Sequence, residues 1–381
     1  MIEWADTDRM VRDAIREFVD RELRPHIEEL EHGDLPPYDL IRTFFKSFGL
    51  DALARESFDP DGTGGDRGGD RAALSLITVS ELSRVGTGLV TAMGVSVGLA
   101  GGTIMSRGTP EQRTRWARDL LTFDKVGAWA ITEPDSGSDA FGGMKTVARR
   151  DGDRYVLNGQ KTFITNGPYA DTLVVYAKLD DEVATFVLDS GMPGLTQSKP
   201  LRKMGIHSSP TGQLFFDDVV LEPDRLLAGS GRDSARANFA GERYGVAAMA
   251  LGIIEECLRL STDYARSRVA WGRPIGDYQL IQLKLATMEV ARLNVQNLVF
   301  RTVELLRAGR TPTLAEASAM KLYSSQAATE VAMEAVQLFG GNGYMSEYRV
   351  EQLARDAKAL MIYAGSNEVQ VTHIAKDLLR R

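Results

Sequence analysis

The chain has 381 residues, 43% of them hydrophobic and 25% charged, which is typical of a folded globular protein with two or three domains. Its 45 basic and 52 acidic residues give a net charge of −7, which argues against nucleic acid and anionic membranes as partners. The single cysteine, Cys257, excludes an intramolecular disulfide and predicts a cytoplasmic protein, and the four histidines lack metal-ligand spacing, so no metal is expected. The N-terminus lacks the basic and apolar regions of a signal peptide. Because no run reaches about 18 apolar residues, no membrane segment is expected.

Residues 1–125 are predicted to form an α-helical domain, because apolar residues recur there at helical spacing. The last of these helices has Thr109 as its N-cap and Pro110 at its first position, where the missing N–H is tolerated. The glycine-rich segment 59–70 is predicted to be a mobile surface loop, and a second hypothesis is that it gates access to a site. Helices are predicted over residues 8–30, 38–50, 72–105 and 110–121.

Residues 126–228 change to a period of two and predict an antiparallel β domain. The dipeptides Asp151-Gly152 and Asn158-Gly159 are typical of tight hairpin turns, because they accept positive φ values. Strands are predicted over residues 127–131, 145–149, 154–157, 161–165, 172–176, 184–188 and 213–217.

Residues 229–381 return to the helical period. Long helices joined by short loops should pack antiparallel as a four-helix bundle. Helices are predicted over residues 238–267, 278–308, 314–338, 346–356 and 366–379.

Gly94 to Gly98 reads G-x-S-x-G, the pattern of a hydrolase nucleophile elbow. That motif needs a strand before it, whereas this segment lies in a helical run of small residues. Close helix packing is the simpler interpretation. The sequence has no G-x-G-x-x-G after a strand and no P-loop, so the usual nucleotide motifs are missing.

The segment 127–139 runs from a strand into a turn rich in hydroxyl groups. Thr132, Ser136 and Ser138, together with backbone N–H groups, are suited to holding phosphate oxygens. A purely structural turn remains the alternative.

Two further segments have unusual composition. Phe163 and Thr165 would share one face of a strand, which offers an aromatic ring and a hydroxyl to a planar cofactor, although an ordinary strand also fits. Residues 337–343 end a helix in three glycines, which permit close backbone approach to a ligand or form a helix C-cap.

These segments belong to six that together resemble the acyl-CoA dehydrogenase family of flavoproteins, in the family's order and over nearly the whole chain. The resemblance implies a mainly α fold with a central β domain: an N-terminal helical domain, an antiparallel β domain and a C-terminal four-helix bundle. It also implies a homotetramer or dimer. The matching segments are TEPDSGSD (132–139), KTFITNG (161–167), KMGIHSSPT (203–211), RSRVAWGRPIGDYQ (266–279), AVQLFGGNGY (335–344) and IYAGSNEVQ (362–370).

The resemblance implies FAD as the cofactor, with part of its site supplied by a neighbouring subunit. Phe163 would flank the isoalloxazine ring, and Thr165 would bond its N5 region. Further flavin or pyrophosphate contacts would be Trp129, Ile131, Thr132 and Ser138. Contacts from the neighbouring subunit would be Arg268, Trp271, Gln279, Gln337 and Gly341. Contacts at the start of the last helix would be Ser366 and Glu368.

The implied reaction is α,β-dehydrogenation of an acyl thioester, in which a carboxylate removes the α-proton and the β-hydrogen passes as hydride to flavin N5. Much of the family carries this base in a Tyr-Glu-Gly-Thr motif, but this chain has Ala364 at the glutamate position. Glu242 matches the position used by isovaleryl-CoA and long-chain acyl-CoA dehydrogenases. Its apolar helix would raise its pKa, as a base for such a weak acid requires. The alternative is a first-turn glutamate that stabilises a helix N-terminus.

Three further substrate contacts are implied. Arg243 fits the family's arginine beside the base, or it is a surface residue. The N–H of Ala364, with a flavin ribityl hydroxyl, would hold the thioester carbonyl, and Gly365 and Ser138 would also line the substrate.

Several departures from the family pattern keep alternatives open. Ala240 stands where a polar residue often contacts the CoA adenine, so an acyl or aminoacyl group on a carrier protein is a second substrate hypothesis. A third hypothesis is a non-catalytic partner subunit of a mixed oligomer. Electron-transferring flavoprotein or oxygen would accept the electrons.

Overall fold

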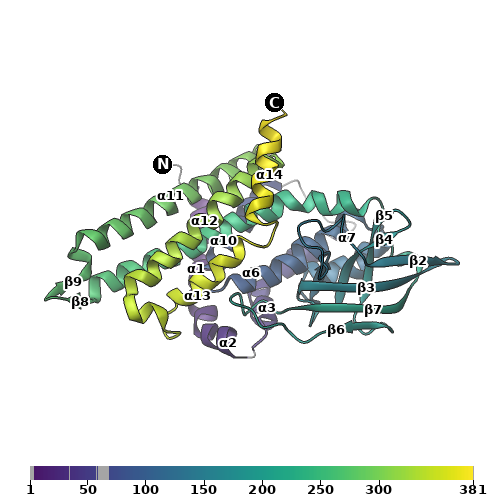
Figure 1. The fold of residues 1–381 in the computed structure, drawn as a ribbon, viewed down its shortest axis with the longest axis horizontal. Helices are drawn as coiled ribbons and strands as arrows, with labels where there is room; N and C mark the ends of the chain where they lie inside the picture. The colour runs from purple at the N-terminus through teal and green to yellow at the C-terminus, as the bar shows by residue number, and fades with distance from the viewer. Residues whose placement is uncertain (1–3, 34, 57, 59–67, 381) are drawn as a thin grey trace.

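The computed structural model describes residues 4–33, 35–56, 58 and 68–380. The long helices α10 (Gly231–Ser267), α11 (Gln279–Arg307) and α12 (Leu314–Phe339) lie side by side at one end of the molecule, and the β-sheet forms the other end (Figure 1). The N-terminal helices and the bundle share one hydrophobic core, whereas two further core clusters centre on the sheet. The fold therefore places a helical body beside a β domain.

The N-terminal region is helical as predicted, but the single helix over residues 8–30 is wrong. The first helix ends at Phe18, and a π turn and a 3₁₀ turn follow before helix resumes at Ile27. Pro25 explains the break, because it lacks the N–H of an interior helical position. Most of the predicted loop at 59–70 lies outside the described residues. The elements are α1 (Asp6–Phe18), η1 (Val19–Leu23), η2 (Arg24–His26), α2 (Ile27–His32), α3 (Tyr38–Ser47), α4 (Leu50–Glu56), α5 (Gly68–Ser83), α6 (Thr87–Met93), η3 (Gly94–Gly101), α7 (Gly102–Arg107), α8 (Pro110–Gln112), η4 (Arg113–Ala117) and α9 (Arg118–Leu121).

One segment, Thr87–Arg107, is long and apolar enough to cross a membrane by length and composition alone, contrary to the expected absence of such a run. Half of it is buried, and a core helix passes the same test. Its first residue and its middle bond to the two halves of the molecule: Thr87 Oγ1 donates to Asp356 (2.8 Å), and Ser96 Oγ accepts from the Gly127 N–H (2.8 Å). It therefore lies in the core between bundle and sheet. Ser96 sits within η3 with helix before it, so the hydrolase interpretation is wrong.

The sheet is mixed, so the prediction of a purely antiparallel domain is wrong. Strand β4 pairs in parallel with both β1 and β2, and the remaining pairs are antiparallel. The strand order is β1-β4-β2-β3-β7-β6, with β5 paired to β4. The strands are β1 (Gly127–Ala130), β2 (Val147–Asp151), β3 (Arg154–Thr165), β4 (Thr172–Leu179), β5 (Glu182–Asp189), β6 (Leu195–Gln197) and β7 (Thr211–Leu221).

Of the two predicted hairpin turns, one is confirmed. Asp151-Gly152 joins β2 to β3, and Gly152 has φ +62°. Asn158-Gly159 lies inside β3 at an irregularity of the register with β7, so the turn predicted there is wrong. Gly159 has φ +141°, and a Cβ at this position would lie 2.7 Å from Thr146 Cα. Only glycine fits this bulge, which explains why the dipeptide resembled a turn.

The C-terminal helices form the predicted bundle with shifted boundaries. Helix α10 begins at Gly231 rather than at Asn238, so Glu242 lies in the helix interior and the first-turn alternative is wrong. Helix α12 ends where Gly340 adopts φ +61°, as the glycines predicted. The remaining elements are η5 (Pro223–Arg225), β8 (Val269–Ala270), β9 (Arg273–Pro274), η6 (Ile275–Asp277), η7 (Gly340–Tyr344), α13 (Val350–Leu360) and α14 (Asn367–Leu378).

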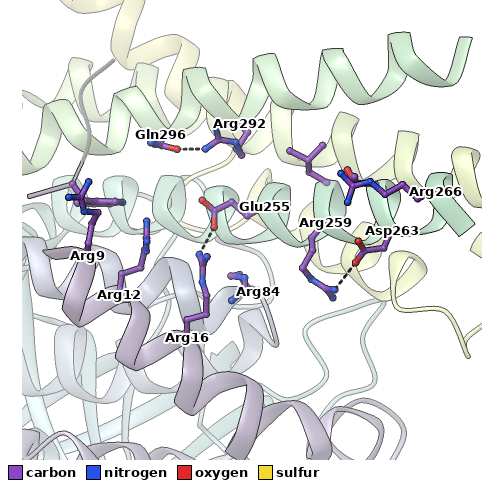
Figure 2. A pocket seen from close by; sticks show the side chains of 13 residues that line it. Arg9, Arg12, Arg16, Arg84, Glu255, Arg259, Asp263, Arg266, Arg292 and Gln296 are labelled. Atoms are coloured by element: carbon purple, nitrogen blue, oxygen red, sulfur yellow. Dashed lines mark hydrogen bonds and ion pairs between the residues drawn. The ribbon is translucent and has the colours of Figure 1, made fainter. Parts of the chain in front are cut away.

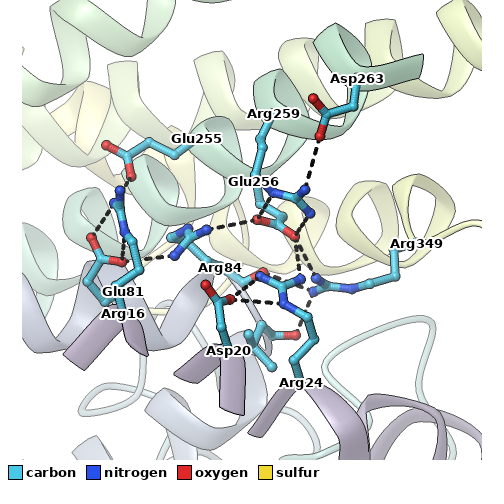
Figure 3. Close-up of polar contacts among 11 residues, drawn as sticks. Arg16, Asp20, Arg24, Glu81, Arg84, Glu255, Glu256, Arg259, Asp263 and Arg349 are labelled. Atoms are coloured by element: carbon cyan, nitrogen blue, oxygen red, sulfur yellow. Dashed lines mark hydrogen bonds and ion pairs between the residues drawn. The ribbon is translucent and has the colours of Figure 1, made fainter. Parts of the chain in front are cut away.

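Glu256 of α10 lies at the centre of a buried ion network (Figure 3). Its carboxylate accepts hydrogen bonds from Arg24 (2.7 Å), Arg259 (2.8 Å) and Arg349 (3.0 Å). Burial acts to raise the pKa of Glu256, but the hydrogen bonds from Arg259 and Arg24 and the charge of Arg349 lower it to about 2. Arg349 also donates to the carbonyl oxygen of Arg84 (3.0 Å). One carboxylate therefore ties the N-terminal helices, α10 and α13 together.

Candidate active site

Glu242 lies where α10 passes from the β domain into the bundle. Upstream, Ser234 Oγ is 3.4 Å from Tyr176 Oη of β4, and Phe239 packs against a core cluster of the sheet. Downstream, the helix is buried in the bundle core from Val246 onward. The side chain of Glu242 therefore stands at the junction of the two halves of the molecule.

The Glu242 carboxyl group has the properties of a proton acceptor. Burial raises the pKa of Glu242 to about 7, although the nearby charges of Arg243 and Lys321 act to lower it. Its carboxylate makes no hydrogen bond or ion pair with another residue that the structure describes. A carboxylate with this pKa and no fixed partner can take a proton at neutral pH.

The turn between α13 and α14 faces this region with unusual backbone. Ala364 has φ +56° and Gly365 has φ +79°, both in the left-handed region. A side chain at Gly365 would be strained by this positive φ, and its Cβ would also lie 2.8 Å from Gln370 Nε2, so glycine is favoured there. The Gln370 amide donates to the carbonyl oxygens of Ala364 (3.1 Å) and Gly365 (2.7 Å). Within the described chain the Ala364 N–H has no acceptor, so it is free to bind a ligand oxygen.

Lys321 of α12 is a site residue that the sequence reasoning missed. Its fully buried ammonium donates to the Gly365 carbonyl (2.9 Å) and to Asn367 Oδ1 (2.9 Å). Burial and the Arg243 charge lower the pKa of Lys321 to about 8. The signal was present, because Lys321 stands on the same helical stripe as the buried residues Ala317 and Ala328.

Arg243 is buried, so the surface alternative for this residue is wrong. It donates to Ser318 Oγ (3.0 Å) and lies 3.2 Å from His373 Nδ1. Its guanidinium is also 3.8 Å from the position that a Gly365 Cβ would take. The structure thus brings Glu242, Arg243 and the 364–365 turn together around Lys321.

The predicted nucleotide contacts form a second group, far from the first. The β8–β9 hairpin that carries Arg268 and Trp271 lies at the end of the bundle opposite the sheet (Figure 1). Trp271 is 91% exposed. Gln279 opens α11 beside this hairpin, and the Phe339 ring before η7 stacks on Tyr264 near the end of α10 (4.0 Å). Gln337 and Gly341 flank that ring in sequence.

The third group lies on the sheet and the turn after β1. Trp129 Nε1 donates to Tyr176 Oη (3.1 Å), and Ile131 is buried, so Ile131 offers a ligand only its backbone. The Thr132 hydroxyl donates to the carbonyl oxygen of Thr162 on β3, and the Ser136 hydroxyl donates to that of Asp139 in its own turn. Of the three hydroxyls proposed for phosphate, therefore, only Ser138 makes no hydrogen bond within the described residues and is exposed.

Three family models cover nearly the whole chain: acyl-CoA dehydrogenase N-terminal domain over residues 5–124, middle domain over 128–219 and C-terminal domain over 229–379. The chain belongs to the acyl-CoA dehydrogenase family. An acyl-CoA dehydrogenase of Bacillus subtilis (strain 168) is 36% identical over 377 residues, 97% of each chain. The structure of butyryl-CoA dehydrogenase from Megasphaera elsdenii matches with a TM-score of 0.90 at 34% identity over 100% of both chains. An acyl-CoA dehydrogenase from Bacillus anthracis complexed with FAD matches with a TM-score of 0.91 at 30% identity, over 99% of this chain and 68% of that one.

These matches confirm the predicted fold class and the predicted activity, FAD-dependent dehydrogenation of an acyl-CoA. The two alternatives, a dehydrogenase of carrier-bound acyl groups and a non-catalytic partner subunit, are not favoured. The individual site residues stay predictions.

The residues of this acyl-CoA dehydrogenase fit a flavin. Phe163 is 69% exposed and has φ +58°, in the left-handed region that a bulky residue rarely adopts, at a register irregularity of β3. Thr165 is partly exposed two residues further on, and Ser366 and Glu368 open α14. The strained backbone presents an aromatic ring to solvent, as a planar cofactor requires. FAD, when bound, supplies the acceptor for the β-hydrogen.

Proposed function

We propose that Glu242 removes the α-proton of a short-chain acyl-CoA. The observation that carries this proposal is the partnerless Glu242 carboxylate, with its pKa raised to about 7, in the cluster that also holds the free N–H of Ala364. The thioester carbonyl would accept a hydrogen bond from that N–H, which stabilises the negative charge that develops on the oxygen as the α-proton leaves. Lys321 and Gln370 hold the turn's carbonyl oxygens, so the N–H stays directed at the substrate.

Arg243 and Lys321 complete this arrangement. Both cations act to lower the pKa of Glu242, so the carboxylate is ionised in part at neutral pH despite its burial. The hydrogen bond from Arg243 to Ser318 Oγ keeps the guanidinium fixed beside the base. Burial thus makes the Glu242 carboxylate basic, and the two cations keep part of it ionised before the substrate binds.

The short acyl chain rests on the likeness to butyryl-CoA dehydrogenase. Anaerobic titration of the flavin with butyryl-CoA should bleach its absorbance at lower concentration than octanoyl-CoA or a branched isovaleryl ester does. A stronger response to the longer or branched ester would contradict the short-chain assignment. No bleaching by any thioester would contradict the activity itself.

We further propose that two copies pair through the exposed face of α11 and complete each other's FAD sites. Leu280, Leu283 and Val290 are exposed along one stripe of this helix, next to the exposed Trp271. An unpaired apolar stripe of this kind is typical of a helix that packs on another chain. The hairpin that carries these nucleotide contacts lies at the end of the bundle opposite the chain's own sheet (Figure 1), which supports a second copy as the occupant.

Val290→Glu, with its matched control Val220→Glu on β7, tests this assembly. Both valines are exposed in the single chain, at 57% and 46%. Val290→Glu should reduce the mass in light scattering and release most of the flavin, because a buried charge without a partner is strongly unfavourable. Val220→Glu should change neither. A smaller species that keeps its full flavin content would overturn the shared site.

The electron acceptor and the compartment also remain proposals. The family resemblance supports electron-transferring flavoprotein as the acceptor, with oxygen as the alternative. The buried, unpaired Cys257 supports a reducing compartment such as the cytoplasm.

A further inference from the structure

A cavity of about 620 Å³ lies between α1, α10 and α11, and arginine dominates its lining. Seven of its residues are arginines and two are carboxylates, Glu255 and Asp263. Figure 2 shows Arg9, Arg12 and Arg16 projecting from α1 toward α10. The cavity therefore collects guanidinium groups from helices that are distant in the sequence.

The innermost guanidinium groups are held by carboxylates. Arg16 makes two hydrogen bonds to Glu81 (2.9 and 2.7 Å), and Arg84 makes one (3.1 Å). Arg16 also pairs with Glu255 (3.3 Å), and Arg84 pairs with Glu256 (3.4 Å). The floor of the cavity is thus a network of ion pairs that fixes the inner guanidinium groups in place.

Two outer arginines, Arg12 and Arg266, retain free hydrogen-bonding capacity. Among the described residues, Arg12 pairs only with its sequence neighbour Asp13, whose side chain is 61% exposed. Arg266 is exposed and forms no ion pair or hydrogen bond within the described part of the chain. Exposed pairs of this kind contribute little, so both guanidinium groups can turn to a stronger anion. The guanidinium fork binds phosphate oxygens in pairs.

The cavity is separate from the acyl-CoA site and from the pairing face of α11, and only its outer end, at Arg266, comes within two residues of a predicted nucleotide contact, Arg268. Glu255 follows Glu242 by 13 residues on α10, which is about 20 Å along a helix. Arg292 lies nine residues beyond Leu283, or about two and a half helical turns, so it faces away from the apolar stripe of α11. Neither the acyl-CoA site nor the pairing face of α11 includes this cavity.

We propose that this cavity binds a small polyphosphate, either inorganic or the phosphate chain of a nucleotide. From Glu255 to Arg266 the lining of α10 extends about 16 Å, which suits a chain of phosphates better than a single one. Trp4 and Leu258 add apolar surface at the wall, where a nucleoside can pack. The seven guanidinium groups and the length of the lining together favour a ligand that carries several phosphates.

The FAD-loaded enzyme can be titrated calorimetrically at fixed ionic strength with tripolyphosphate, ATP, AMP and adenosine. We expect saturable binding of tripolyphosphate and ATP, weaker binding of AMP and none of adenosine. Equal affinity for the first two would identify the phosphate chain as the ligand, and tighter ATP binding would add a nucleoside contact. Absence of saturable binding by both would overturn the proposal.

The double variant Arg12→Gln/Arg266→Gln should weaken tripolyphosphate binding by about tenfold or more, since hydrogen bonds between charged groups are lost. Its turnover of butyryl-CoA should be unchanged. Arg236→Gln is the matched control, because Arg236 is an exposed α10 arginine outside the cavity. Equal weakening in the control would indicate nonspecific attraction and overturn the site. So would a change in oligomeric mass without a change in affinity, which would assign this face to a second copy.

Discussion

Glu242→Gln should retain bound FAD and the native fold but lose turnover by about 10³-fold, the range in which removal of a general base falls. Glutamine has nearly the same shape, so the packing of α10 is preserved while the proton acceptor is removed. Stopped-flow mixing with butyryl-CoA should show almost no flavin bleaching. In the native enzyme, kcat/KM should rise as the pH rises through about 7, because the carboxylate must be ionised to accept the proton.

A rescue variant sharpens this test. Glu242→Gln/Ala364→Glu should recover part of the rate, because the 364 position belongs to the same cluster as Glu242. Glu289→Gln, on α11 outside this cluster, is the control and should behave as the native enzyme. Normal bleaching in Glu242→Gln would assign the base elsewhere, and failure of the double variant alone would show that the 364 side chain does not reach the α-carbon.

Lys321→Met should reduce kcat by about 10²-fold with a smaller change in KM, comparable to the loss of one oxyanion hydrogen bond. The substitution leaves the Gly365 carbonyl and Asn367 Oδ1 without their ammonium donor, so the turn no longer holds the Ala364 N–H in place. In the native enzyme, activity should fall as the pH rises through about 8, where Lys321 loses its charge. This alkaline limb of the profile should be absent in the variant.

Two further variants distinguish a positioning role of Lys321 in catalysis from a role in the stability of the fold. Each buried group left unsatisfied costs about 1–3 kcal/mol, so Lys321→Gln, which keeps an uncharged N–H donor group, serves as the variant that retains more of the fold. It should likewise lack the alkaline limb while keeping its flavin. Lys358→Met on α13 removes an exposed lysine of the same region and should leave the profile unchanged. An alkaline limb that persists in Lys321→Gln would show that Lys321 does not control the turn.

The order of the elements was predictable from periodicity, because long amphipathic helices and alternating strands follow from local patterning. The failures have two different causes. Asn158-Gly159 resembles a turn, yet the pairing of β3 with β7 continues through it as a bulge. The parallel pairing of β4 depends on contacts between segments far apart in the sequence, which periodicity does not record.

The site residues that lie in a family motif could be predicted from the sequence. Those whose role depends on tertiary packing could not. The family resemblance marked Glu242 and the 364–365 turn, and the structure places them in one cluster. It gave no role to Lys321, which donates to the Gly365 carbonyl from another helix, or to Gln370, which donates to the same carbonyl from the next helix along the chain. Likewise, the Thr132 hydroxyl is occupied by a tertiary contact with Thr162, which the sequence pattern does not record.

Helix α10 runs unbroken for 37 residues from the sheet to the far end of the bundle. Its proton acceptor therefore belongs to the longest helix of the described chain, while the opposing N–H belongs to a short connection whose shape depends on two side chains. Loosening of the C-terminal segment, by heat or by trimming α14, should impair polarisation of the carbonyl long before it displaces the acceptor.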